Sequence, residues 1–367
     1  MNCFFKLLSR LPLRLLQTVG AAVGELTFWL SPGYRRRTRE NLRQAGYDED
    51  ELFRRAGRAA GRQALESVWL WYRPADEVMA RVDADEETTK LVGDAMRSGR
   101  PIVFMTPHVG CFEVLPVWLA DTFWEETKRS IAILYRPPKR DFLKKLVGEA
   151  RRAPGIEPVP TNLSGVKRII RMLREGHTFG ALPDQVPAHG DGVWSDFFGR
   201  PAYTITLPVK VARQFDAIRI FAWGERSGRG WKVRAVEWTE PLTGDMQKDV
   251  DAMNRMIESI IRRMPAQYAW SYNRYKIPSG MRHNRARYAK QPRPDDSITE
   301  KAAVHRDSGF ESGTFYENFC GDNFPEGSLP ALRLHVGEAL FIAGTNMSDA
   351  LHQYPPDQNV SLGFAPV

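Results

Sequence analysis

Residues 100–113 read RPIVFMTPHVGCFE, and this stretch decides the fold. Residues 102–105 form a short apolar run between Pro101 and Pro107, which is typical of a strand buried on both faces of a sheet. Residues 111–119 are apolar enough to begin a packed helix. Because open α/β sheets place their chemistry at the carboxyl ends of strands, the sequence predicts a functional site at His108.

Glu113 follows His108 by five residues, a spacing that does not place both side chains on one face of a helix. The two can meet only if His108 lies in the turn before the helix, which Pro107 favours by ending the strand. Spacing alone does not identify a catalytic pair, since His352 and Asp357 share it. A core histidine with a satisfied hydrogen bond is the alternative interpretation.

The charge of the chain is unevenly distributed. The 367 residues carry a formal net charge of +8, with 44 basic and 33 acidic residues in positions 1–280 and 8 and 11 in positions 281–367. A basic body favours an anionic partner, such as nucleic acid, a membrane surface or an acidic protein. The basic residues are dispersed and form no recognition motif, which argues against nucleic acid.

The cysteines indicate a reducing compartment. Cys3, Cys111 and Cys320 are odd in number, lie far apart and lack metal-ligand spacing, so we expect neither disulfides nor zinc. Cys111 lies close to His108 in the sequence, and a Cys–His nucleophile pair is one interpretation. A small apolar residue on a packed helix is the other.

The first 34 residues are rich in Leu, Phe and Val, and charges interrupt every stretch before the roughly 18 uncharged residues of a secure spanning helix. No small-residue cleavage site follows, which argues against a secretory signal. Residues 11–30 could span a membrane with two charges tolerated, lie in the interface, or pack on the protein's own core. The arginines at 35–37 and 39 predict a cytoplasmic flank attracted to anionic lipid.

Residues 35–280 alternate between strand and helix patterns, which predicts an α/β domain with a central, mostly parallel or mixed sheet flanked by helices. Strands are expected at 102–105, 130–134, around 159, 178–182, 217–223 and 231–238. Helices are expected at 48–72 with Asp48 as cap, 85–97, 139–152, 162–175, 205–213 and 249–263. Residues 191–194 are expected to form a loop and 196–201 a turn. Residues 281–367 show neither the helical nor the strand period of apolar residues, which predicts an irregular or disordered extension.

Polar residues follow three of the predicted strands. They are His108, Arg136, and Asp184 with its neighbour Gln185, and their side chains could converge on one crevice. An arginine at a strand end suits anion binding, although a solvated loop arginine is the alternative. Gly199, in the predicted turn, permits close approach of the backbone to a ligand.

Several blocks, taken in order, resemble the lipid A biosynthesis acyltransferases, the lauroyl and myristoyl transferases of Gram-negative bacteria within the lysophospholipid acyltransferase superfamily. The blocks are HVGCFE at 108–113, YRP at 135–137, DQ at 184–185, FFGRPAYT at 197–204, and YAW at 268–270 with Arg274 and Lys276. The resemblance covers about residues 1–280. The sequence departs from the family pattern at three places. KRD at 139–141 stands where the family often has an Asn-Pro pair. Val186 stands where an acidic residue is common, and Tyr272 stands where many members have a histidine.

The resemblance implies an O-acyltransferase without a metal or redox cofactor. It would move a fatty acyl chain from an acyl carrier protein thioester to a hydroxyl of an anionic lipid A precursor, at the cytoplasmic face of the bacterial inner membrane. His108 would act as general base, with Glu113 holding the imidazole tautomer. The residues expected to bind substrate are Arg136, Asp184, Gln185, Gly199 and Pro201.

Two other functional classes stay open at this point. One is an acyltransferase that modifies a phospholipid or another glycolipid from a different donor. The other is a non-enzymatic peripheral lipid-binding protein, which would need the basic helices but not His108. In domain terms, we expect a membrane anchor or interfacial helix at 1–34, an acyltransferase domain at 35–280 and an extension at 281–367.

Overall fold

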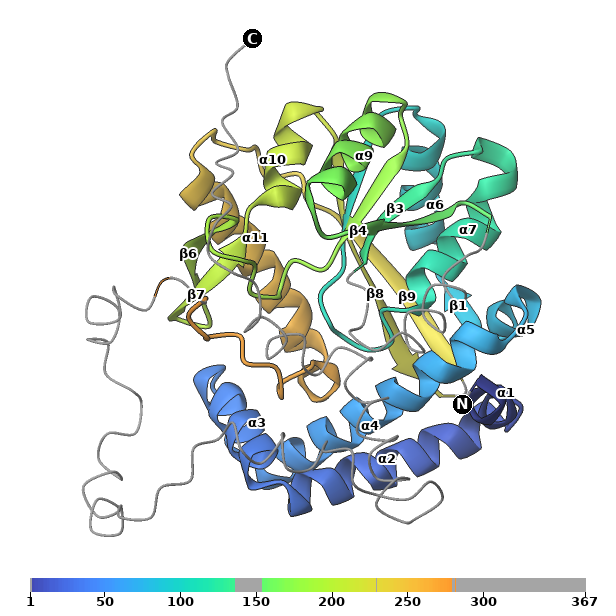
Figure 1. Cartoon of the computed structure of the whole chain (residues 1–367), viewed down its shortest axis with the longest axis vertical. Coiled ribbons are helices and arrows are strands. Elements are labelled where there is room, and N and C mark those ends of the chain that lie inside the picture. The colour runs from blue at the N-terminus through green and yellow to red at the C-terminus, as the bar shows by residue number, and fades with distance from the viewer. Residues whose placement is uncertain (1, 136–153, 229, 279–280, 282–367) are drawn as a thin grey trace.

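The computed structural model describes residues 2–135, 154–228, 230–278 and 281. Its centre is a sheet in the order β1-β9-β8-β2-β5-β3-β4, in which the β8–β9 pair is antiparallel and the other pairs are parallel (Figure 1). The predicted mixed α/β sheet is therefore confirmed. The strands are β1 (Val82–Ala84), β2 (Ile102–Met105), β3 (Ile131–Tyr135), β4 (Ile156–Pro160), β5 (Thr178–Ala181), β8 (Ile218–Ser227) and β9 (Gly230–Glu237).

Strand β2 is buried on both faces, as its apolar run predicts. Successive side chains point to opposite faces, so Ile102 and Phe104 enter one hydrophobic core while Val103 and Met105 enter the other. Residues of α4, α6 and α7 belong to the first core, and residues of α9, α10 and α11 belong to the second. These helices are α4 (Asp50–Tyr72), α6 (Glu86–Arg97), α7 (Val114–Thr127), α9 (Leu163–Arg174), α10 (Leu207–Gln214) and α11 (Met246–Arg263).

The strand directions gather the polar strand ends at one edge. Strands β2, β5, β3, β4 and β8 run parallel to one another, so their carboxyl ends meet at the same edge of the sheet. The long helix α4 passes this edge, beside the end of β8 (Figure 1), and contacts the short helix η1 (Pro265–Gln267). This edge carries every described site residue discussed below except those of a separate hairpin.

The N-terminal segment forms three helices, α1 (Asn2–Ser9), α2 (Leu13–Leu30) and α3 (Pro32–Gln44). Helix α2 packs on α4 through glycines: a Cβ on Gly24 would overlap the carbonyl oxygen of Gly57, and one on Gly61 would overlap that of Gly20. Within the described residues, no helix is long and apolar enough to cross a membrane. Of the three interpretations of residues 11–30, the structure shows packing on the protein's own core.

The face of α1 and α2 turned away from α4 remains apolar. Of the exposed large hydrophobic side chains among the described residues, all but Leu163 lie in this segment or in the turn between its helices. Those in α2, at positions 15, 19, 26, 29 and 30, fall on one face of the helix, so they form one stripe. The stripe consists of Leu7, Leu11, Leu15, Val19, Leu26, Trp29 and Leu30, with exposed fractions from 38% to 64%.

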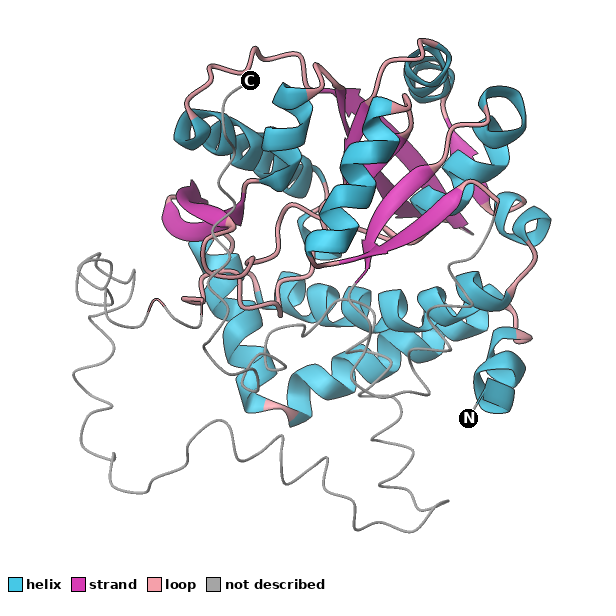
Figure 2. Ribbon diagram, turned by 45° about the horizontal axis from the view of Figure 1, so that its top comes forward, coloured by secondary structure: helices cyan, strands magenta, loops and turns pink. Residues whose placement is uncertain are grey.

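The structure corrects the prediction of a loop at residues 191–194. These residues begin β6 (Gly192–Phe197), which pairs antiparallel with β7 (Arg200–Ile205) in a hairpin that stands apart from the central sheet (Figure 2). Phe198 and Gly199 have φ angles of 50° and 70°, the left-handed pair of a two-residue hairpin turn. Asp191 and Gly192 masked the strand signal, since both residues are typical of turns.

The expected cap of α4 is also wrong. Helix α4 begins after Glu49 without a side-chain cap, and Asp48 instead pairs with Arg43 at 2.7 Å. Of the two residues that the sequence offers as cap of α9, Asn162 and Ser164, the structure shows Asn162, whose side chain accepts a hydrogen bond from the backbone N–H of Gly165. The predicted helix at 139–152 and the segment 282–367 lie outside the described residues.

Candidate active site

The centre of the site is a buried hydrogen-bonding contact between His108 and Asp184. The imidazole Nδ1 lies 2.8 Å from Asp184 Oδ1, and the backbone N–H of His108 donates to Asp184 Oδ2 at 3.0 Å. His108 is three residues past Met105, Asp184 is three residues past Ala181, and those two strand ends are register partners in neighbouring strands. The sheet therefore brings the two side chains together at equal offsets, and the carboxylate fixes both the ring and the backbone of His108.

The second imidazole nitrogen lies against Gln185. Nε2 of His108 is 3.0 Å from the side-chain amide nitrogen of Gln185. An amide N–H can only donate, so this contact places a lone pair on Nε2 and the ring proton on Nδ1, where it is donated to Asp184. In this tautomer Nε2 can accept a proton. The predicted convergence of His108 with Asp184 and Gln185 is what the structure shows.

The loop that carries His108 is fixed by backbone contacts. The backbone N–H of Ala269 donates to the carbonyl of His108, and Val109 forms a bridge with Tyr268. Gly110 has a φ of 61°, and a Cβ there would overlap the carbonyl oxygen of Gly224. Only glycine fits this turn, because it combines a left-handed backbone with a close approach to β8. His108 thus lies in the turn before α7, as Pro107 predicts.

The carboxylate of Asp184 is held ionised in a buried position. Burial alone would raise its pKa, but the charge of His108, its two hydrogen bonds to His108 and the charge of Arg274 bring the pKa below its ordinary value. Burial raises the pKa of Tyr268 well above its ordinary value, and the charge of Asp184 and a hydrogen bond to it raise it further. Tyr268 therefore remains a neutral hydroxyl beside the pair.

Arg274 links this environment to the β6–β7 hairpin. It is buried, donates to the carbonyl of Tyr203 at 2.9 Å and to Thr204 Oγ1 at 2.6 Å, and lies over the ring of Phe197. Next to it, burial raises the pKa of Tyr272 to about 12, and the Tyr272 hydroxyl accepts a hydrogen bond from the backbone N–H of Val186. Sequence reasoning noted Arg274 within a family block but gave it no role at the site.

Glu113 occupies a different position from the one we expected. The Nδ1 partner predicted to be Glu113 is Asp184, whereas Glu113 accepts a hydrogen bond of 3.4 Å from the indole N–H of Trp71. Glu113 is buried at the start of α7, five residues beyond His108. The function of holding the imidazole tautomer therefore passes to Asp184 in this structure, and a role for Glu113 in the reaction stays a prediction.

The geometry does not favour Cys111 as a nucleophile. Cys111 is fully buried, and burial raises the pKa of its thiol well above the ordinary value, with the charge of Glu66 raising it further. A thiolate is the reactive form of cysteine, and this environment disfavours it. The interpretation as a small buried apolar residue fits the structure better than a Cys–His pair.

The remaining predicted substrate-binding residues do not lie against His108 in the described part of the chain. Gly199 and Pro201 belong to the β6–β7 hairpin, where the conformation of Gly199 is required by the turn itself. Phe197 of the same hairpin packs against Tyr268, so the hairpin meets the site through that ring. Arg136 lies outside the described residues. Within the described ranges, no three His, Cys, Asp or Glu side chains converge to hold a metal ion.

Comparisons with known proteins identify the family of this chain. The model of the bacterial lipid A biosynthesis acyltransferases matches residues 1–277. A lipid A biosynthesis acyltransferase of Haemophilus influenzae is 25% identical over 182 residues, which cover 49% of this chain and 55% of that protein. The match thus spans about half the length of that curated relative. The family match includes the whole described domain except Pro278 and Met281, and the chain belongs to the bacterial lipid A biosynthesis acyltransferase family.

Proposed function

We propose that this protein transfers a fatty acyl chain from an acyl carrier protein thioester to a hydroxyl group of a lipid A precursor. The observation that carries the proposal is the His108–Asp184 contact in a chain of this family, because it leaves Nε2 of a buried imidazole available to a substrate hydroxyl. A general base must lie within hydrogen-bond reach of the proton that it removes. Gln185, which contacts the same nitrogen, marks the place that the hydroxyl would take.

The proposed reaction is a direct acyl transfer. The acceptor oxygen attacks the thioester carbonyl while His108 Nε2 takes the hydroxyl proton, and Asp184 stabilises the imidazolium that forms. The tetrahedral intermediate then breaks its carbon–sulfur bond, and the imidazolium returns the proton to the leaving thiolate. An ester and a free thiol result, and no protein nucleophile is needed. Because the raised pKa keeps Tyr268 a neutral hydroxyl, Asp184 has no tyrosinate anion beside it.

The exposed apolar stripe of α1 and α2 supports a location at a membrane surface. Apolar side chains along one face of a helix bind the interface, and basic residues beside them add attraction to anionic lipid. Lys6, Arg10 and Arg14 lie in or next to these helices and are exposed. We propose that the protein lies on the cytoplasmic face of the bacterial inner membrane, where the lipid acceptor is also anchored.

The test uses the purified protein with an acyl-loaded acyl carrier protein and a defined lipid A precursor, with the products measured by mass spectrometry. We expect an acceptor heavier by one acyl chain with the wild type and none above background with His108→Ala. Acylation of a lysophospholipid but not of the lipid A precursor would show that the proposed acceptor is wrong and that a phospholipid takes its place. Membrane binding without transfer to either would leave the lipid-binding alternative and overturn the enzymatic proposal.

A further inference from the structure

A second polar cavity borders the loop that carries His108. It has a volume of about 330 Å³ and is lined by Glu51, Arg55, Arg58, Ala59, Arg62, Arg226, Ala266 and Gln267. Its lining contains four arginines and one carboxylate. The three arginines of α4 share one face of that helix, because residues three and four apart are neighbours on a helix. A guanidinium N–H of Arg226 donates to the carbonyl of Gly110, and the N–H of Gly110 donates to the carbonyl of Gln267, so the cavity adjoins the catalytic loop.

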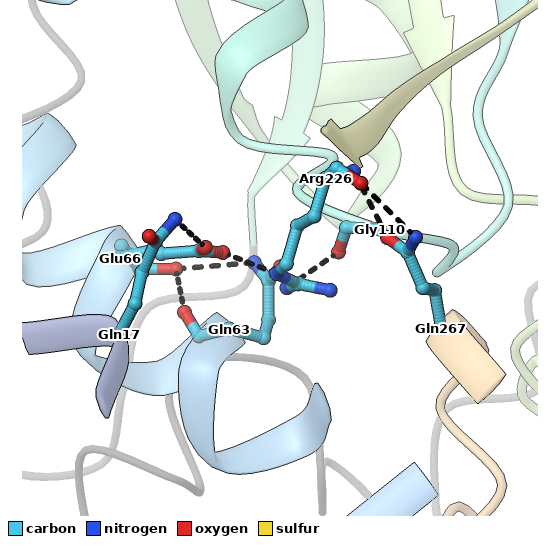
Figure 3. Close-up of polar contacts among 7 residues, drawn as sticks. Gln17, Gln63, Glu66, Gly110, Arg226 and Gln267 are labelled. Atoms are coloured by element: carbon cyan, nitrogen blue, oxygen red, sulfur yellow. Dashed lines mark hydrogen bonds and ion pairs between the residues drawn. The ribbon is translucent and has the colours of Figure 1, made fainter. Parts of the chain in front are cut away.

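Two of the four arginines already have carboxylate partners. Arg58 makes a two-pronged contact with Glu25 at 2.7 and 3.0 Å and also contacts Glu51. Arg226 contacts the fully buried Glu66 at 2.6 Å. Figure 3 shows the Arg226 guanidinium held between Glu66, Gln63 and Gly110.

The other two arginines of the cavity lack such partners in the described part of the chain. Arg55 and Arg62 make no hydrogen bond or close ion pair with any residue that the structure describes. The side chain of Arg226 is only 9% exposed, and its Nη1, buried at the cavity wall, has no hydrogen-bond partner in the described part of the chain. A buried guanidinium nitrogen without an acceptor is costly, because its donors have lost water without a replacement.

The charges in the cavity also repel one another. Burial lowers the pKa of Arg62 below its ordinary value, and the positive charge of Arg226 lowers it further. A dianion placed between the two guanidinium groups would offset both effects and accept hydrogen bonds from the unpartnered nitrogens. Planar guanidinium donors match the oxygens of a phosphate in a two-pronged geometry.

We propose that this cavity binds a phosphate monoester group, held by Arg55, Arg62 and the unpartnered Nη1 of Arg226. Its position favours a phosphate carried on a lipid headgroup. Glu25, the partner of Arg58, belongs to α2 and lies next to Leu26 of the exposed apolar stripe. Helices α2 and α4 lie side by side (Figure 1), so a headgroup in a membrane that meets the stripe would reach the arginine face of α4. Binding at this site does not depend on the proposed acyl transfer.

The test compares Arg62→Gln with Arg174→Gln in the full-length protein. Both changes remove one positive charge, but Arg174 is exposed on α9 and does not line the cavity. Arg62 makes no hydrogen bond to described residues, so its replacement spares the fold, and Arg55→Gln is the second cavity variant. Arg226 is left intact, because its loss would strand the buried charge of Glu66. Two probes are used: inorganic phosphate in calorimetry, and phosphatidylcholine vesicles with and without phosphatidic acid in flotation at physiological salt.

We expect Arg62→Gln and Arg55→Gln to weaken binding of both phosphate probes by about tenfold, while Arg174→Gln changes it by less than about twofold. Equal losses in all three variants would overturn the proposal, because they would reduce the effect to general surface charge. If the cavity variants lost binding of inorganic phosphate but bound the vesicles as before, the cavity would remain a phosphate site. The proposal that this phosphate belongs to a lipid headgroup would then be wrong. Failure of acyl transfer in a separate assay would not alter any of these results, since no turnover is measured here.

Discussion

Two buried pairs, each of a nitrogen-bearing side chain and a carboxylate, contact the same loop, residues 108–111, and they differ in one chemical property. His108 meets Asp184 at 2.8 Å, and Arg226, which holds Gly110, meets Glu66 at 2.6 Å. A guanidinium keeps its proton at any accessible pH, whereas imidazole is the side chain that ordinarily exchanges one near neutrality. Burial of such a pair therefore does not by itself identify the candidate catalytic centre here. What identifies it is a side chain that exchanges a proton near neutrality, the imidazole of His108. The two pairs should therefore respond differently to mutation.

The largest effect is expected at the imidazole. His108→Ala removes the base but leaves the loop held by backbone contacts of its neighbours, so kcat/KM should fall by about 10² to 10⁴. The melting temperature should change little by comparison. Steady-state kinetics and circular dichroism on the same preparation measure both quantities. A well-folded variant with near wild-type turnover would exclude His108 as the base.

The second cluster should instead respond in stability. Arg226→Met leaves the fully buried Glu66 without its partner, which should lower the free energy of unfolding by about 3–5 kcal/mol in urea denaturation. The double change Glu66→Met with Arg226→Met removes the stranded charge and should recover much of that loss. If Arg226→Met left stability unchanged but abolished turnover, the contrast between the two clusters would be wrong.

Asp184→Asn should reduce kcat by about 10², because an amide can donate to Nδ1 and so moves the ring proton to Nε2.

The same carboxylate should make the stability of the protein depend on pH. The native pKa of Asp184 is lowered, so its contribution to stability is complete above the unfolded value of about 4 and is lost as pH falls through the lower native value. Urea denaturation at a series of acidic pH values should therefore show a shallower loss for Asp184→Asn than for the wild type. An equally steep loss in both would contradict the ionised state of this carboxylate.

The smallest effect is expected at Cys111. Cys111→Ala should keep kcat within about threefold of the wild type and cost about 1 kcal/mol of stability, because it removes one buried sulfur atom. Mass spectrometry of the protein after incubation with acyl donor should show no acyl adduct. An acyl-cysteine that disappears in Cys111→Ala together with turnover would restore the covalent alternative.

Much of the sheet edge follows from local sequence. The apolar run before Pro107 predicts β2, and the apolar run at 178–182 is followed by Asp184 and Gln185, which meet His108 at the edge. Local sequence does not identify Asp184 as the carboxylate that contacts His108. Asp184 and His108 stand three residues past register partners, but strand order, which makes β2 and β5 neighbours, is not visible in the sequence. The family resemblance implied Glu113 for this role, whereas the hydrogen-bond network of the structure places Asp184 at Nδ1.

The other missed features also depend on distant partners. Glu66 and Arg226 are 160 positions apart, and each looks like an ordinary charged residue in its own segment. Helix α2 packs through Gly20 and Gly24 onto Gly57 and Gly61 of α4, and the spacing of four within each pair does not show which two helices meet. The β6 strand was hidden by turn-forming residues at its start.

The position of the imidazole proton is the most direct test of the His108–Asp184 assignment. Nitrogen-15 NMR of the protein labelled at histidine, with His108→Ala to assign the signals, reports which ring nitrogen carries the proton. We predict a protonated Nδ1 and an unprotonated Nε2 in the wild type, unchanged in Glu113→Gln and reversed in Asp184→Asn. A proton on Nε2 in the wild type, or a tautomer that reverses in Glu113→Gln and not in Asp184→Asn, would contradict the assignment and return the orienting function to Glu113.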